Sequence, residues 1–394
     1  MNAAILQREV QDFIHEKSSK PIDISKLILS GSPFSDISSQ ELAQQIKGRL
    51  KAKDKLSLWY HTKGIYYPPS INMEQTSSEL TGLYKSKLVS GERLIDLTGG
   101  LGIDDYYFSK VINKVTHCEL NESLSVIATH NFSALGASNI VTHTGDAISY
   151  LQNQEYQYDW IYIDPSRRND IKGKVFFLED CLPDVPKHID LLFSRSTNVL
   201  IKTSPLLDIQ TGIKSLQFVK EIHCVAVKNE VKELIWVLSK DYIGKVHITS
   251  CNITNDQQKL FSFSIEEEVT ASCSFSSPKK YLYEPNAAIL KSGAFKCVAT
   301  RYGLDKLHPH SHLYTSDMLI DFPGRRFEII SHAPYHKKNL KANAITKANI
   351  TVRNFNETVA NLRKKLKIKD GGTDYLFFTT DATGAKISIH CKKA

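Results

Sequence analysis

Short apolar segments alternate with amphipathic segments through the middle of the chain. Helical patterns separate apolar segments of strand length at residues 92–97, 114–119, 139–142, 158–163 and 198–202. This alternation is typical of a parallel sheet whose strands are joined by crossover helices. Residues 221–238 then read as two long strands joined by a polar turn, which predicts an antiparallel hairpin at the end of the sheet. The pattern therefore predicts an α/β domain with a seven-stranded sheet.

The segment before this domain has a helical pattern. Apolar residues recur at helical spacing over residues 4–16, and a second helix is predicted to begin at the Ser38-x-x-Glu41 capping box. A similar pattern, Thr76-x-x-Glu79, predicts the helix that leads into the sheet. We expect these helices to cover one edge of the sheet.

Two smaller modules are predicted after the sheet. Residues 241–321 alternate polar and apolar positions and then contain a turn and a helix, so we expect an α+β domain with its own antiparallel sheet. Residues 322–394 contain a basic helical pattern at residues 356–367 and a hairpin bracketed by glycine turns. The four predicted domains therefore cover residues 1–73, 74–240, 241–321 and 322–394.

Positive charge is concentrated at the C-terminal end of the chain. The whole chain has a net charge of +8, whereas residues 322–394 contain 15 Lys or Arg against 5 Asp or Glu, a net charge of +10. The preceding residues therefore carry a net charge of −2. A basic excess confined to one segment favours a polyanionic partner for that segment. The alternative is a basic surface that only keeps the protein soluble.

The cysteines and the hydropathy pattern indicate a cytoplasmic protein without a metal site. The seven cysteines are scattered and include no C-x-x-C pair, which favours reduced thiols and argues against a zinc site. The first residues carry acidic side chains and no apolar signal core, so we do not expect export. No apolar run reaches the ~18 residues that a membrane span requires.

A glycine-rich loop follows the first predicted strand. The sequence RLIDLTGGLGID places Gly99, Gly100 and Gly102 between that strand and a helix, where backbone N–H groups can approach a ligand. A dinucleotide-binding fingerprint requires a third glycine where this chain has Asp105. Asp96, within the turn, would also repel a pyrophosphate. A ligand that carries positive charge fits better, and S-adenosylmethionine (SAM) has both an ammonium and a sulfonium group.

Carboxylates occupy the ends of the first four predicted strands. They are Asp96, Glu119, Asp146 and Asp164, and the carboxyl ends of parallel strands form the edge at which an open α/β sheet binds ligands. Asp96 is suited to the SAM ammonium, Glu119 to the ribose diol and Asp146 to the adenine amine. Asp146 is equally suited to capping its own helix.

The fourth strand ends in Asp164-Pro165-Ser166, beside the expected position of the sulfonium. A carboxylate next to a backbone carbonyl fixed by proline can accept hydrogen bonds from an exocyclic amine and aim its lone pair at the methyl group. Because SAM's leaving group departs neutral, positioning rather than strong base catalysis is required. These residues therefore predict a methyl acceptor with an amino group.

These motifs together resemble a class I SAM-dependent methyltransferase. DLTGGLGID, CELN, TGDA and the DPS after the fourth strand stand in the order of that family, and DPS is similar to its (D/N)-P-P-(Y/F/W) motif for exocyclic amines. EQTSSELTGLYK, LIKTSPLLD, YLYEPNAAILKSGAF and SHAPYHKKNLKA further resemble the bacterial methyltransferases with a ferredoxin-like insert and a C-terminal THUMP-like domain. The resemblance implies a Rossmann-like sheet, SAM as cofactor and a structured RNA, tRNA or rRNA, as partner.

Three sets of site residues follow from the motifs, the resemblance and the charge. The expected catalytic residues are Asp164, Pro165, Ser166 and Arg167. The expected cofactor contacts are Asp96, Thr98, Gly99, Gly100, Gly102, Glu119, Asp146 and Ala147. The expected RNA contacts are Arg168, Arg325, Arg326, Lys337, Lys338, Lys364 and Lys365.

Two departures from the motif keep other functions open. Ser166 and Arg167 replace its second proline and its aromatic residue, so a base would stack on an arginine plane, or the arginines would hold a phosphate. Asp164, Lys202 and Glu233, with a lysine such as Lys85, also resemble the set that ribose 2′-O-methyltransferases use. A third possibility is an RNA-binding protein with a SAM fold and no catalysis.

Overall fold

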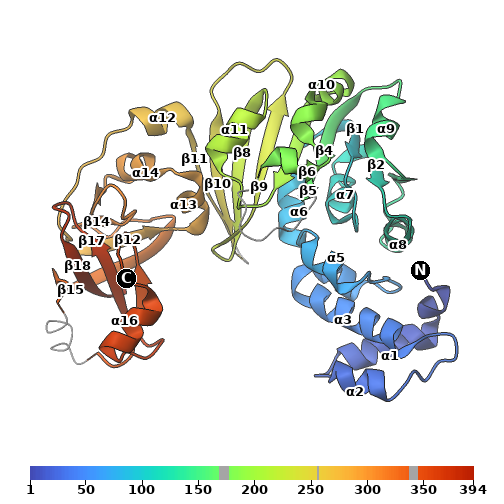
Figure 1. Ribbon diagram of the computed structural model, residues 1–394, viewed down its shortest axis with the longest axis horizontal. Helices are drawn as coiled ribbons and strands as arrows, with labels where there is room; N and C mark the ends of the chain where they lie inside the picture. Colours follow the sequence, from blue (N-terminus) through green and yellow to red (C-terminus); the bar gives the residue numbers. More distant parts are fainter. Residues whose placement is uncertain (168–176, 255–256, 337–344) are drawn as a thin grey trace. The chain divides into compact units, whose positions relative to one another are not determined.

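The computed structural model describes residues 1–167, 177–254, 257–336 and 345–394. These residues form two compact units, one of residues 1–220 with 235–243, the other of residues 221–234 with 244–394 (Figure 1). Arg168, Lys337 and Lys338, three of the expected RNA contacts, lie outside the described residues. Among the helices of the described residues, none combines the length and the apolar character of a membrane span.

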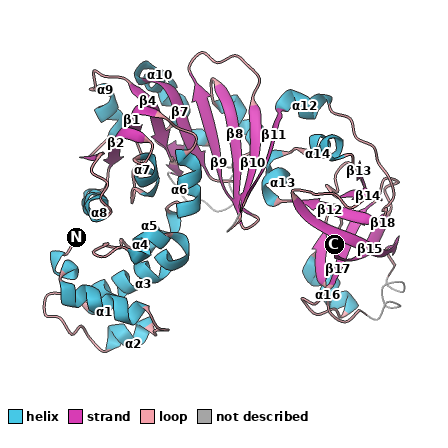
Figure 2. Cartoon of the chain, turned by 180° about the vertical axis from the view of Figure 1, so that it is seen from behind, coloured by secondary structure: helices cyan, strands magenta, loops and turns pink. Residues whose placement is uncertain are grey.

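The first unit begins with a group of short helices, in which α1 and α2 pack against α3 (Figure 2). The predicted capping box is present, since Ser38 accepts the Glu41 N–H and Glu41 accepts the Ser38 N–H. The N-cap predicted for the helix before the sheet, Thr76, was wrong, because Ser78 caps that helix. The helices are η1 (Ala3–Leu6), α1 (Arg8–Ser18), α2 (Ile24–Leu29), α3 (Ser39–Lys55), α4 (Ser57–His61), α5 (Ser70–Gln75) and α6 (Glu79–Ser86).

These helices share a hydrophobic core with the helices of the α/β sheet. Trp59 is buried and its ring lies 4.9 Å from that of Tyr106, edge to face. Apolar residues of α1 and α3 and residues of α8 such as Phe132 belong to the same buried cluster. The N-terminal helices therefore fold against the α/β domain.

The α/β part of this unit contains five parallel strands in the order β7-β4-β1-β2-β3, as the pattern predicted. The register pairs Asp96 with Tyr162 on one side and with His117 on the other, so neighbouring strands end at the same edge. The strands are β1 (Gly91–Asp96), β2 (Ile112–Glu119), β3 (Ile140–Thr144), β4 (Tyr158–Ile163) and β7 (Ser196–Thr203). The connecting helices are α7 (Ile103–Phe108), α8 (Glu122–Ala134), α9 (Ala147–Gln152), α10 (Val185–Arg195) and α11 (Ile209–Ser215).

A hairpin of β8 (Val219–Val227) and β9 (Glu230–Ser239) follows. Its two-residue turn, Lys228 and Asn229, has positive φ at both positions, the backbone that tight hairpins require. The full strand order is β11-β10-β8-β9-β7-β4-β1-β2-β3, so the sheet has nine strands where seven were expected.

The two additional strands are β10 (His247–Ile253) and β11 (Gln258–Ser264). They pair antiparallel with each other as predicted, but β10 also pairs in parallel with β8, so they do not form a separate sheet. Two polar residues of β10 have partners inside the protein. Ser250 donates a hydrogen bond to Ser292, and Asn252 accepts one from the Asn229 N–H, which allows both polar side chains to be buried.

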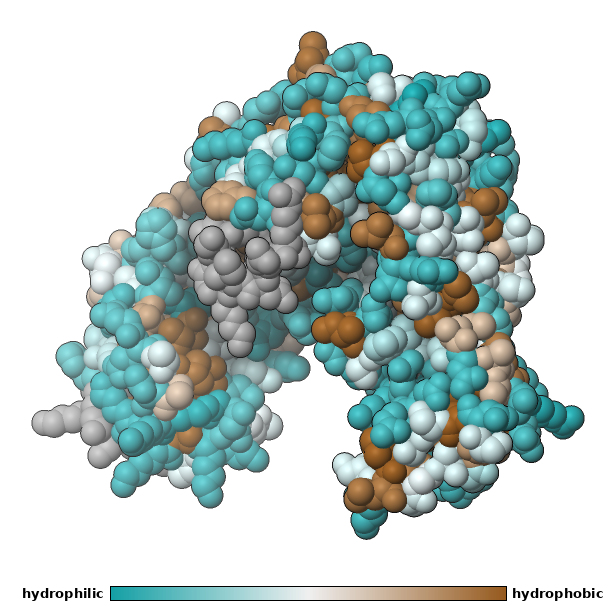
Figure 3. Space-filling view, turned by 45° about the vertical axis from the view of Figure 1, so that its right-hand side comes forward, coloured by the Kyte–Doolittle hydropathy of each residue, from teal (hydrophilic) through white to brown (hydrophobic). Residues whose placement is uncertain are grey.

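One seven-stranded sheet, of order β13-β14-β12-β15-β18-β17-β16, contains strands from both of the predicted small modules. Its strands are β12 (Tyr281–Pro285), β13 (Asp305–Lys306), β14 (Tyr314–Ser316), β15 (Gly324–Pro334), β16 (Asn349–Val352), β17 (Asp374–Thr380) and β18 (Lys386–Lys393). The helices are α12 (Ile265–Thr270), α13 (Ala287–Ser292), α14 (Phe295–Tyr302) and α16 (Val359–Leu366), the last within the predicted basic helix. The face drawn in Figure 3 is mostly hydrophilic, with its hydrophobic residues in small scattered groups.

Candidate functional site

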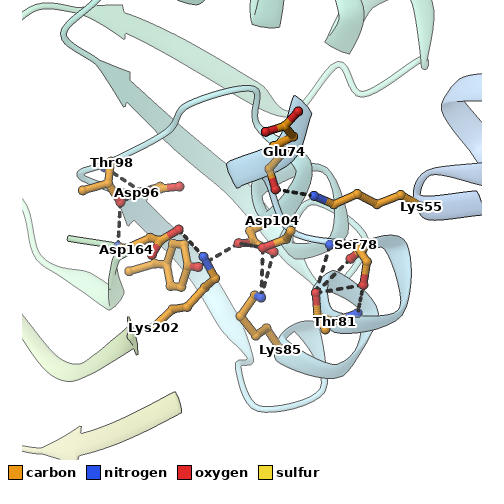
Figure 4. A network of polar contacts seen from close by, with 12 residues as sticks. Lys55, Glu74, Ser78, Thr81, Lys85, Asp96, Thr98, Asp104, Asp164 and Lys202 are labelled. Atoms are coloured by element: carbon orange, nitrogen blue, oxygen red, sulfur yellow. Dashed lines mark hydrogen bonds and ion pairs between the residues drawn. The ribbon is translucent and has the colours of Figure 1, made fainter. Parts of the chain in front are cut away.

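Thr98 joins the carboxyl ends of β1 and β4 (Figure 4). Its backbone N–H and its hydroxyl donate to Asp96 Oδ1 at 2.7 and 2.9 Å, and its hydroxyl oxygen accepts the Asp164 N–H at 2.7 Å. The residues after the two strands are therefore held together by one side chain. Asp96 is buried beneath this junction, so the predicted ammonium partner has Thr98 as its own partner.

Glu119, at the end of β2, holds the glycine loop. Its Oε2 accepts the Gly100 N–H at 2.8 Å, and its Oε1 accepts the Asn121 N–H at 2.7 Å. Gly100 and Gly102 have φ of +59° and +76°, which favour glycine because it has no Cβ. Each carboxylate oxygen has further acceptor capacity, so Glu119 can hold the loop and also accept hydrogen bonds from a diol.

The interior side of the loop is packed too closely for side chains on two of its glycines. A Cβ on Gly99 would lie 2.2 Å from the His117 ring, and a Cβ on Gly102 would lie 2.1 Å from the Phe132 ring. Asp105, which stands where a dinucleotide fingerprint has glycine, is fully buried and lies 2.6 Å from His117 Nδ1. The departure from the fingerprint therefore supplies a buried partner for the histidine under the loop.

The pKa shifts show that this interior cluster favours uncharged forms. Burial, followed by the Asp105 charge, raises the pKa of Asp96 well above its usual value. Burial and the Asp104 charge likewise raise the pKa of Asp105, and burial lowers the pKa of His117. The cluster is therefore suited to supporting the loop.

Asp104 and Lys85 form a buried ion pair that sequence reasoning did not assign. Asp104 Oδ2 accepts hydrogen bonds from Ser77 at 2.8 Å and from Tyr162 at 2.7 Å, and Oδ1 lies 3.2 Å from Lys85 Nζ (Figure 4). Burial alone would raise the pKa of Asp104, but the ammonium groups of Lys85 and Lys202 and the two hydroxyl donors lower it overall. The sequence signal was weak, because a lone lysine on a short helix is usually exposed.

Asp164 forms an ion pair with Lys202 at the end of β7. The side chain of Asp164 is 37% exposed and that of Lys202 is 13% exposed, so the carboxylate is the part of the pair that a solute can reach. Lys202 also lowers the pKa of Asp104, which places its ammonium near both carboxylates. Two lysines and two aspartates thus form one network that opens to solvent at Asp164 (Figure 4).

The remaining predicted residues of the first unit have simpler environments. Asp146 caps α9 by accepting the Ser149 N–H at 2.6 Å, and the hydrogen bonds from Ser149 lower its pKa; Ala147 is the first residue of that helix. Pro165 is buried, whereas Ser166 is exposed. Ser166 begins the short strand β5 (Ser166–Arg167), which pairs with β6 (Cys181–Leu182). The 3-10 helix η2 (Leu178–Asp180) comes directly before β6.

The predicted RNA contacts of the second unit differ in their availability. Arg325 donates to the buried carboxylate of Glu284 at 2.6 Å, Arg326 donates to the Ile320 carbonyl, and Lys365 donates to Glu357 and Tyr335. Lys364 is exposed. Among the described residues, no group of three or more His, Cys, Asp or Glu side chains is placed to hold a metal ion.

The chain matches two domain families and is similar to known methyltransferases over most of its length. Residues 281–323 match the family model of a ferredoxin-like domain, and residues 324–393 match that of a THUMP-like domain. The crystal structure of a putative methyltransferase from Porphyromonas gingivalis W83 matches 99% of this chain and 98% of that one, with 34% identity and a TM-score of 0.89. An uncharacterized SAM-dependent methyltransferase of Mycobacterium tuberculosis is 21% identical over 278 residues, 68% of this chain and 71% of the relative.

The buried pair predicts a pH-dependent stability. Replacing Lys85→Met leaves Asp104 charged and buried, so we expect a loss of about 3–5 kcal/mol in unfolding free energy at pH 7. The lowered pKa of Asp104 means that its contribution in the wild type is complete above about pH 4 and is lost as the pH falls. In Lys85→Met the buried carboxyl is protonated more readily, so the difference between variant and wild type should narrow in acid.

Urea denaturation followed by circular dichroism at pH 7 and pH 4.5 measures this difference. The double variant Lys85→Met/Asp104→Asn, which removes both charges, serves as the matched control and should regain most of the lost stability. A double variant as unstable as the single one would mean that packing, and not charge, causes the loss.

Proposed function

Because the chain belongs to the family of SAM-dependent methyltransferases with ferredoxin-like and THUMP-like domains, we propose that it transfers the methyl group of SAM to structured RNA. The observation that carries the proposal is the arrangement at one edge of the parallel sheet. There Glu119 holds a glycine loop, and Asp164 is joined to the same edge through Thr98. One side of the edge is suited to the cofactor and the other to the acceptor.

The residues at this edge fit SAM. The backbone of Thr98 to Gly102 would lie along the methionine part, Glu119 would accept the ribose hydroxyls, and Asp146 with Ala147 would face the adenine. Glu119 has acceptor capacity left after binding Gly100 and Asn121, and Asp146 has a second oxygen beyond the one that caps α9. When bound, SAM supplies an electrophilic methyl group on a positively charged sulfur.

For the acceptor we propose the exocyclic amine of a nucleobase, positioned by Asp164 and the carbonyl of Pro165. Asp164 lies beside the ammonium of Lys202 and is partly exposed, so its carboxylate can accept a hydrogen bond from the amine and stabilise the positive charge that develops on the nitrogen. Ser166 is exposed next to it. Alignment of the amine with the methyl group then provides most of the rate acceleration.

A second candidate is methylation of a ribose 2′-hydroxyl, and the Asp164–Lys202 ion pair favours it. An ammonium beside the acceptor position stabilises an alkoxide, which an amine acceptor does not need. The two other residues of the set expected for ribose methylation are less accessible than Asp164. Lys85 is buried against Asp104, and Glu233 is buried in β9. The amine therefore remains the first proposal, and product analysis separates the two.

Recognition of RNA is proposed from the charge of the THUMP-like segment. Several of its basic residues are committed to internal contacts, as described above for Arg325 and Lys365. In the described part of the chain, its exposed lysines without an ion pair are Lys347, Lys364, Lys367, Lys369, Lys392 and Lys393. These six have their charges available for phosphates, and the first four lie on or beside α16 and β16. Shape and phosphate contacts, rather than base edges, should dominate such binding.

The first functional prediction concerns cofactor affinity. Isothermal titration of the wild type with SAM should give a dissociation constant of micromolar order, near −8 kcal/mol. Glu119→Ala removes the ribose acceptor and frees the Gly100 N–H, so affinity should fall by about 1–3 kcal/mol. Glu122→Ala, an exposed change in the following helix, is the control and should leave affinity unchanged. Absence of SAM binding by the wild type would contradict the proposed function.

The second prediction separates the two acceptors. Asp164→Ala should abolish methyl transfer while SAM affinity stays within a few fold, because Asp164 faces the acceptor. Lys202→Met should reduce amine methylation only moderately, since the amine needs no deprotonation before attack. Mass spectrometry of nucleosides from a deletion strain and its parent identifies the modified atom. If the deletion strain lacked a ribose 2′-O-methyl group that its parent carries, and the Lys202→Met variant were inactive, the second candidate would be established instead.

The third prediction concerns the exposed lysines. Filter binding of total tRNA across a salt series should give a slope of log affinity against log salt of about −0.7 for each neutralised phosphate in single strands. The triple variant Lys364→Ala/Lys367→Ala/Lys369→Ala should make this slope shallower by about 1–2 units if two or three of these lysines contact phosphates. Its matched control replaces the exposed lysines Lys20, Lys26 and Lys63 by alanine. Equal slopes for the two triple variants would leave the C-terminal lysines as a solubilising surface.

A further inference from the structure

A histidine-rich loop of the second unit has no role in the methyl-transfer site. Residues 308–312, HPHSH, connect β13 to β14 and contain His308, His310 and His312. The loop belongs to the segment that matches a ferredoxin-like domain, whereas α16 belongs to the segment that matches a THUMP-like domain.

The loop is fixed by buried polar groups. The ammonium of Lys306, which is buried, donates to the Pro309 carbonyl at 2.9 Å. The buried hydroxyl of Ser311 donates to the Thr380 carbonyl at 2.8 Å and accepts from Thr379 at 2.9 Å. The His312 ring stacks on Phe295, with ring centroids 3.6 Å apart. The loop is therefore pinned at both ends and in its middle, which holds the half-buried His308 and the exposed His310 in place.

Hydrogen bonds determine which nitrogen of His308 carries a proton. Its Nδ1 lies 3.1 Å from the His310 N–H and 3.0 Å from Asn354 Nδ2, and both of these groups are donors. Nδ1 must then be the acceptor, so the neutral ring carries its proton on Nε2. Burial and the charges of His310, Lys386 and Lys306 lower the pKa of His308, against the opposing charge of Asp381. His308 therefore offers a permanent N–H donor near neutral pH.

The surroundings of the loop carry more positive than negative charge. Among the charged side chains that shift the pKa values of His308 and His312, Lys306, Lys386 and Arg353 are positive and Asp381 is negative. Arg353 shares the carboxylate of Glu284 with Arg325, and Asp381 accepts the N–H groups of Thr383 and Ala385. Burial, Lys306 and Arg353 lower the pKa of His312 to about 4, which reflects the same positive field.

Two residues of this region adopt backbone conformations that side chains disfavour. His312 has φ of 52° and Asn354 has φ of 50°, both in the left-handed region. Asn354 is the residue that faces His308, and Lys386 donates to the Asn354 carbonyl at 3.1 Å. Residues in disfavoured backbone conformations cluster at binding sites, and here two of them lie in loops that are joined by the hydrogen bond between Asn354 and His308.

We propose that the loop 308–312, together with Asn354 and Lys386, is a binding subsite for a phosphate group of the RNA backbone. The choice of RNA rests on the proposed function; the choice of phosphate rests on the fixed N–H donor in a positive field. His308 donates through Nε2, His310 provides an exposed ring beside it, and Lys386 supplies charge from the adjoining strand.

The test measures the affinity of the full chain for total tRNA by filter binding. His308→Phe replaces the imidazole by an aromatic ring without nitrogens, and His310→Ala removes an exposed ring. We expect each substitution to weaken RNA binding about tenfold. Asn354→Gly removes the amide and suits the left-handed backbone, so it keeps the fold while weakening binding. The control is His332→Ala, an exposed histidine of the same unit, which should bind RNA as the wild type does.

The salt dependence and a competitor sharpen the outcome. Because His308 is neutral, its loss should lower affinity at every salt concentration without changing the slope, unlike the lysine variants. Millimolar inorganic phosphate should compete with RNA more effectively in the wild type than in His308→Phe. If His308→Phe, His310→Ala and Asn354→Gly all bound RNA with wild-type affinity, the subsite would be overturned and the proposed function would still stand. Absence of RNA binding by the wild type would overturn both.

Discussion

Burying carboxylates at one edge of a sheet is the constraint on which this site depends. A buried charge without a partner costs several kcal/mol, and four aspartates lie at this edge. Asp96 and Asp105 favour their neutral forms, with Thr98 and His117 as hydrogen-bond partners. The other two, Asp104 and Asp164, each face a lysine ammonium. All four acids therefore have partners, and Asp164 is the one that solvent reaches.

The glycine loop is shaped by what lies beneath it as much as by what it binds. His117 and Phe132 fill the space that side chains on Gly99 and Gly102 would need, while Glu119 holds the loop from its outer side. The loop is thus positioned by packing and hydrogen bonds that are present without a ligand. A preorganised loop spends less of its binding free energy on ordering itself.

The second unit solves a similar problem of charge with arginines. Two of them share the buried carboxylate of Glu284, and α14 begins where Glu268 accepts the backbone N–H groups of Phe295, Lys296 and Cys297. Basic residues therefore serve two purposes here. Some hold the fold together, and the remainder form the exposed positive surface, so the net charge of the segment overstates what a polyanion can contact.

The parallel sheet, its terminal hairpin and the strand-end acids could be predicted from the sequence, because local periodicity reports which positions are buried and parallel strands end at one edge. The sequence also located the glycine loop and the basic C-terminal segment. Three pairings could be seen only in the folded protein: Lys85 neutralises Asp104, Asp105 supports His117, and Arg325 pairs with Glu284. Nor does periodicity show that β10 extends the large sheet, since its buried Ser250 and Asn252 look like solvent-facing residues. Such pairings depend on contacts between segments distant in the chain, and local patterns carry no information about which distant partner a polar group finds.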